Sequence, residues 1–104
     1  MKNVEKIRNS QLCFFANIDD IGLSIIKALH NKNMNIPKET ELISYGGNTW
    51  TKAVTPAMSS ICLNIEAMSG ECLAILWQMI VSGNWTPIAK IYPSEVIYRE
   101  SLSE

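Results

Sequence analysis

The chain has 104 residues, a length that suits one domain. Its apolar fraction of 47% and charged fraction of 18% are ordinary for a soluble globular protein. Nine basic residues stand against ten acidic ones, and the basic residues are scattered along the chain. This composition excludes the basic patch on which nucleic-acid binding depends, so we expect these residues not to bind DNA.

The sequence shows no targeting segment, no membrane span and no cysteine motif. No apolar run approaches the roughly 18 residues of a membrane span, and no apolar segment of a secretory signal follows the charged amino terminus. We therefore expect a cytoplasmic protein with no membrane partner. Cys13, Cys62 and Cys72 are odd in number, lack a CxxC spacing and lie among apolar residues, which predicts buried, reduced thiols.

Strands and helices are expected to alternate along the chain. In chain order they are a strand at 12–16 that is buried on both faces, a helix that begins at 19–20 and ends in residues 30–33, a strand at 42–45, a helical turn near 50, a strand at 59–63, a helix at 65–81 and an extended segment at 88–98. The helices are long enough to connect parallel strands, so the order predicts a layered α/β fold.

Both predicted helices have broad apolar surfaces. The first has two stripes, which are Ile21, Ile25, Ala28 and Leu29 on one side and Leu23, Ile26 and His30 on another. One stripe can lie on a sheet, and the other needs a partner from the same chain or a second subunit. The second helix has one broad stripe, typical of core, formed by Ile65, Met68, Cys72, Ile75, Leu76 and Met79.

Residues that could carry catalysis are scarce. His30 is the single histidine, and no carboxylate stands three or four residues from it. The sequence has no glycine-rich phosphate loop, no nucleophile elbow and no His/Cys metal spacing. We therefore predict no catalytic residue, no cofactor and no metal, and a binding protein in place of an enzyme.

Asp19 and Trp50 are the candidate ligand-binding residues. Asp19 follows the first strand at a helix start, and ligands of open α/β sheets bind outside the carboxyl ends of strands. Its carboxylate can accept hydrogen bonds from two neighbouring hydroxyls, as on a sugar. Alternatively, Asp19 is a plain helix cap. Trp50 either stacks on the apolar face of a sugar or plugs its loop with a hydrophobic side chain.

Four stretches resemble one family in order and spacing. They are FFANIDDIGLSIIKAL, IPKETELISYGG, TPAMSSICLNIEAMS and IYPSEVIYRES, and together they span nearly the whole chain. The first is similar to a strand–turn–helix shared with periplasmic sugar-binding proteins. The last two resemble segments specific to the lactose-repressor (LacI/GalR) family of transcription regulators.

This resemblance implies a partial periplasmic-binding-protein-like fold of type I, three-layer α/β/α with a mostly parallel sheet. Residues 1–63 would belong to the C-terminal lobe, 64–85 to a crossover helix of the N-terminal lobe, and 86–104 to a return strand and tail. The helix-turn-helix head and the first half of the effector domain of such a regulator are absent from this sequence, so DNA binding would need that missing head.

The resemblance also implies residue roles. Asp19 falls on the family's sugar-binding aspartate, but Ile18, Gly46, Gly47 and Leu63 replace polar residues of the usual pattern, so the pocket has fewer polar groups. The implied function is effector sensing, with a sugar as the small-molecule ligand; the alternative is a free-standing sugar-binding protein of the periplasmic transport type. Homodimer contacts are expected at Leu23, Ile26, His30, Val54 and Met58.

Overall fold

The computed structural model describes residues 12–102, which form two compact units. The first unit consists of the described residues up to Cys62 and from Glu95 onward, and the second is Leu63–Ser94. The segment that returns after the second unit joins the first unit from Glu95 onward.

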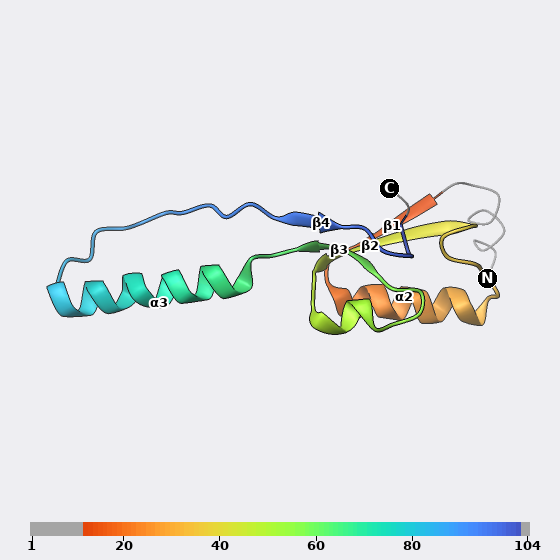
Figure 1. The fold of residues 1–104 in the computed structure, drawn as a ribbon, viewed down its shortest axis with the longest axis horizontal. Helices are drawn as coiled ribbons and strands as arrows, with labels where there is room; N and C mark the ends of the chain where they lie inside the picture. Colours follow the sequence, from red (N-terminus) through yellow and green to blue (C-terminus); the bar gives the residue numbers. More distant parts are fainter. Residues whose placement is uncertain (1–11, 103–104) are drawn as a thin grey trace. The chain divides into compact units, whose positions relative to one another are not determined.

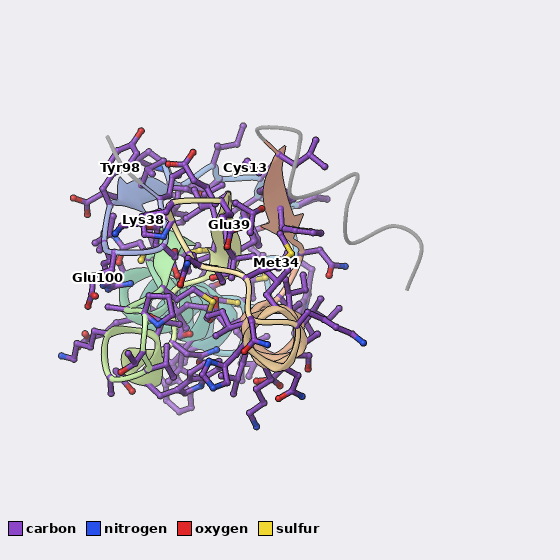
Figure 2. All side chains as sticks on the ribbon, turned by 90° about the vertical axis from the view of Figure 1, so that its right-hand side faces the viewer. Cys13, Met34, Lys38, Glu39, Tyr98 and Glu100 are labelled. Atoms are coloured by element: carbon purple, nitrogen blue, oxygen red, sulfur yellow. The ribbon has the colours of Figure 1, made fainter. Side chains whose placement is uncertain are left out.

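The first unit is built on a four-stranded sheet in the order β1-β2-β3-β4 (Figure 1). The strands are β1 Leu12–Ala16, β2 Thr40–Gly46, β3 Ser59–Cys62 and β4 Glu95–Ile97. The first three strands are parallel, and β4 is antiparallel to β3. Figure 2 shows Cys13 of β1 and Tyr98, which follows β4, on opposite sides of this unit. The predicted α/β class with a mostly parallel sheet is confirmed.

Helix α2 (Asp19–Asn31) connects β1 to β2 and covers one face of the sheet, while the short 3-10 helix η1 (Thr49–Lys52) precedes β3. The core between sheet and helix contains Ala16, Ile26, Leu42 and Met58. The buried face of α2 consists of Gly22, Ile26 and Leu29, so it takes one residue from each predicted stripe, while Ile21 is 44% exposed. Gly22 is essential to this close approach, because a Cβ there would lie 2.7 Å from the Met58 sulfur.

The opposite face of the sheet is open within the described part of the first unit. Phe15 is 61% exposed, and Tyr45 and Val96 on the neighbouring strands are also exposed. The expectation that the first strand is buried on both faces is therefore wrong, because α2 and η1 both lie on one side and no described helix of this unit covers the other. Cys13 is exposed as well, so its thiol is not buried as expected.

The carboxyl-terminal tail is hydrogen-bonded between the starts of β2 and β3. Ser101 is completely buried: its hydroxyl donates to the Leu42 carbonyl at 2.6 Å and accepts from the Ser59 N–H at 2.8 Å. The Ser101 carbonyl accepts from the Leu42 N–H at 2.9 Å. The Arg99 guanidinium adds a 2.6 Å hydrogen bond to the Met58 carbonyl. The tail thus completes the backbone hydrogen bonding where β2 and β3 begin.

The second unit contains helix α3 (Ile65–Ser82) and the extended segment that follows it. The helix ends at Gly83, whose φ of 71° is left-handed and whose N–H donates to the Met79 carbonyl. Glu71 accepts hydrogen bonds from Lys90 and Tyr92 and so holds the extended segment to the helix.

No residue of α3 is buried, and Cys72 is exposed, so the described residues cover the predicted core stripe only in part, at Ile75 and Met79. By length and composition alone, α3 also qualifies as a membrane span. The expectation that no apolar run reaches that length is wrong on this measure. Core helices of soluble proteins meet the same criterion, so it is weak evidence for a membrane.

Candidate functional site

Asp19 lies at the edge of the sheet where the parallel strands end. It is the first residue of α2, directly after the turn that follows β1, and it is 2% exposed. The N-cap position is occupied by Ile18, and the helix start has no side-chain capping bond. Asp19 is therefore not the plain side-chain cap that the alternative interpretation describes.

The Asp19 carboxylate is hydrogen-bonded to residues of β2 and of the loop after it. Ser44 donates from its hydroxyl to Oδ1 at 2.6 Å. Asn48 donates twice to Oδ2, from its backbone N–H and from its side-chain Nδ2, both at 2.8 Å. The Ser44 hydroxyl also lies 2.9 Å from that of Ser60 on β3. A single buried carboxylate thus links α2 to β2 and the loop directly, and to β3 through the Ser44 hydroxyl.

Gly46 allows the loop to pass this close to Asp19. A Cβ at position 46 would lie 2.8 Å from Asp19 Oδ2, and the backbone φ of 138° is one that L side chains rarely adopt. The next residue is constrained too, since a Cβ on Gly47 would lie 2.4 Å from the Cys62 sulfur. Burial raises the pKa of the Cys62 thiol, which keeps it in the unreactive protonated form.

Asn48 is a residue of this edge that the sequence prediction did not include. Its backbone N–H and side-chain amide are held by Asp19, and its carbonyl accepts from the Thr51 N–H at 3.0 Å and the Thr51 hydroxyl at 2.6 Å. The residue is nevertheless exposed. Its position two residues after a strand end was a usable signal, but its link to Asp19 spans 29 residues of sequence.

Trp50 lies in η1, half-buried against the core cluster. This is the arrangement of the hydrophobic plug, the second of the two interpretations.

Among the described residues, no group of three or more His, Cys, Asp or Glu side chains could hold a metal ion.

A groove of about 630 Å³ lies between α2 and the segments 34–36 and 54–56. Its lining includes four of the five predicted dimer-contact residues, namely Leu23, Ile26, His30 and Val54. Met34, labelled in Figure 2, lines it as well. The fifth predicted residue, Met58, is wrong as a surface contact, because it is completely buried in the core beneath Gly22.

Comparisons with known proteins place these features in context. The profile of the periplasmic binding protein-like domain family matches residues 2–102. The HTH-type transcriptional regulator AscG of Escherichia coli (strain K12) is 28% identical over 87 residues, which are 84% of this chain and 26% of AscG. The chain thus spans about a quarter of the length of this relative.

Two solved structures share the fold. The transcriptional regulator CelR in complex with cellobiose has a TM-score of 0.81 at 24% identity, covering 86% of this chain and 27% of that one. A periplasmic binding protein/LacI transcriptional regulator from Alkaliphilus metalliredigens QYMF, complexed with D-xylulofuranose, has a TM-score of 0.85 at 22% identity, covering 100% of this chain and 39% of that one.

Proposed function

This chain belongs to the periplasmic binding protein-like domain family, as part of the effector-binding domain of a LacI-family transcriptional regulator, and we propose that it senses a sugar. The relatives it matches are transcriptional regulators and not enzymes. The observation that carries the proposal is the hydrogen-bonded polar edge built around Asp19 at the carboxyl ends of β1 and β2, which is where open α/β sheets bind ligands. The sugars bound in the two solved neighbours support the ligand class.

In an intact regulator, effector binding would change operator affinity by favouring one arrangement of two lobes. The sheet unit would belong to the C-terminal lobe, and Leu63–Ser94 would contribute to the N-terminal lobe. DNA contact would fall to a helix-turn-helix head, since this chain has a formal net charge of -1 and no basic cluster among its described elements. The proposed location is the cytoplasm, as for regulators of this family.

The groove beside α2 is the proposed homodimer surface. Leu23, Ile26 and Val54 supply apolar lining, and His30 is exposed at its side. Side chains from two separate segments converge there, which supports a surface built for a partner.

Direct contact of Asp19 with a sugar stays a prediction. The geometry sets a condition for it: one of the three donors to the carboxylate must give way to a sugar hydroxyl. Stacking of Trp50 on a sugar likewise stays a prediction and requires the side chain to leave the core cluster.

The sensing proposal is tested by titrating the isotope-labelled 104-residue chain with cellobiose and with D-xylulose while recording backbone amide spectra. We expect saturable shifts at residues following β1 and β2, in the millimolar range for a site formed by one lobe. Glycerol at matched concentration is the control for non-specific hydroxyl effects. Unchanged spectra with every sugar would contradict the proposal.

A further inference from the structure

The Asp19 carboxylate is poorly placed to receive a ligand. It is 2% exposed, and both of its oxygens already accept hydrogen bonds from Ser44 and Asn48. Gly46 passes so close to Oδ2 that not even a methyl group fits between them. A ligand hydroxyl would have to break a charge-assisted hydrogen bond in order to make one, so little net affinity would result.

Asn48 has the opposite properties, because it is exposed and yet held rigidly. Donation from Nδ2 to Asp19 fixes the plane of the amide, and the amide geometry then directs Oδ1 away from the carboxylate. The backbone of the same residue is fixed at its N–H by Asp19 and at its carbonyl by Thr51. An acceptor already fixed in this way loses little conformational entropy when a ligand binds.

The surroundings of Asn48 indicate the chemistry of the ligand. Asn17, also exposed, follows the neighbouring parallel strand β1 and so lies at the same edge of the sheet. The residues that follow these two strands, 17–20 and 47–49, include no lysine or arginine, and the nearby Arg99 guanidinium already donates to the Thr51 hydroxyl and the Met58 carbonyl. They do include Asp19 and Asp20 in the first turn of α2, whose negative charge opposes an anionic ligand.

We propose that Asn48 is a ligand-contacting residue of this site, that Asp19 is the positioning residue that orients it, and that the ligand is an uncharged sugar and not a sugar phosphate. This inference rests on the proposed function. The Oδ1 atom of Asn48 accepts a hydrogen bond from a sugar hydroxyl, and the buried carboxylate holds the amide in the orientation that this bond requires.

The experiment compares Asn48→Ala with the neighbouring control Thr49→Ala in the full chain, with cellobiose, D-xylulose and glucose 6-phosphate as probes. We expect the wild type to bind a neutral sugar, Asn48→Ala to bind it about tenfold more weakly or worse, and Thr49→Ala to match the wild type. Asp19→Asn should weaken binding too, and it should also speed hydrogen exchange at the Asn48 backbone amide, a readout of lost positioning.

The possible failures are distinguishable. If Asn48→Ala binds as the wild type does while Asp19→Asn loses the sugar, Asp19 is the direct contact and the inference is overturned. If glucose 6-phosphate alone binds, the assigned ligand class is wrong. If the wild type binds none of the probes, the proposed sensing function fails together with the inference. Circular dichroism of each variant establishes that it is folded before binding is compared.

Discussion

At the scale of single residues, Gly46 offers the sharpest test of the Asp19 network. We expect Gly46→Ala to lower the free energy of unfolding by about 3 kcal/mol, since it combines backbone strain with displacement of a buried, hydrogen-bonded carboxylate. Urea denaturation measures the change, and Thr49→Ala, an exposed position three residues further along, should alter stability by less than about 0.5 kcal/mol. In an Asp19→Ala background the glycine substitution should cost about 1 kcal/mol, the strain alone. Equal costs in both backgrounds would show that the contact with Asp19 contributes nothing.

Sequence reasoning reached the position of Asp19 but not its partners. A carboxylate between a strand and a helix is visible as a local pattern, whereas Ser44 and Asn48 lie 25 and 29 residues further along the chain. Gly46 and Gly47 were recognised as departures from the usual acidic pair. The close approach that makes glycine necessary at both positions depends on side chains of other elements and is visible only in three dimensions.

At the scale of elements, the tail after β4 acts as part of the sheet. Replacing Ser101 with alanine removes the hydroxyl that joins the Leu42 carbonyl to the Ser59 N–H and leaves both backbone groups buried and without that partner. We expect a loss of about 2–4 kcal/mol of unfolding free energy, measured by thermal or urea denaturation. Ser82→Ala is a matched control, because its hydroxyl also bonds a carbonyl but is exposed to water; it should change stability by less than about 0.5 kcal/mol. Similar losses in the two variants would exclude a structural role for the tail.

Elements themselves were well predicted, and their burial was not. The helix predicted to begin at 19–20 and to end in residues 30–33 corresponds to α2 at Asp19–Asn31, and the predicted strand at 12–16 corresponds to β1. The buried face of α2 includes Gly22, which has no side chain and so adds nothing to an apolar stripe, although it is the point of closest approach to Met58. Periodicity shows that a helix has an apolar face to bury, but it does not show which element or subunit packs against that face.

That limit matters most at the scale of the whole molecule. Large apolar side chains remain exposed on α3, among them Leu73 at 68%, Trp77 at 62% and Val81 at 65%. Covering each such side chain is worth roughly 1.5–3 kcal/mol. Together with the groove beside α2, these surfaces predict that the 104-residue chain is not a monomer in solution.

We expect sedimentation equilibrium at tens of micromolar to show a homodimer, and two substitutions on α2 identify the surface responsible. Leu23 lines the groove, whereas Ile21, two residues earlier on the same helix, is exposed and does not. A carboxylate introduced by Leu23→Asp would be desolvated without a partner in the interface, at a cost of several kcal/mol, so this variant should be monomeric. Ile21→Asp adds the same charge outside the groove and should remain dimeric.

If Leu23→Asp stays dimeric while Trp77→Glu becomes monomeric, α3 is the interface and the groove is not. An 11.7 kDa species for the wild type would mean that neither surface recruits a second copy.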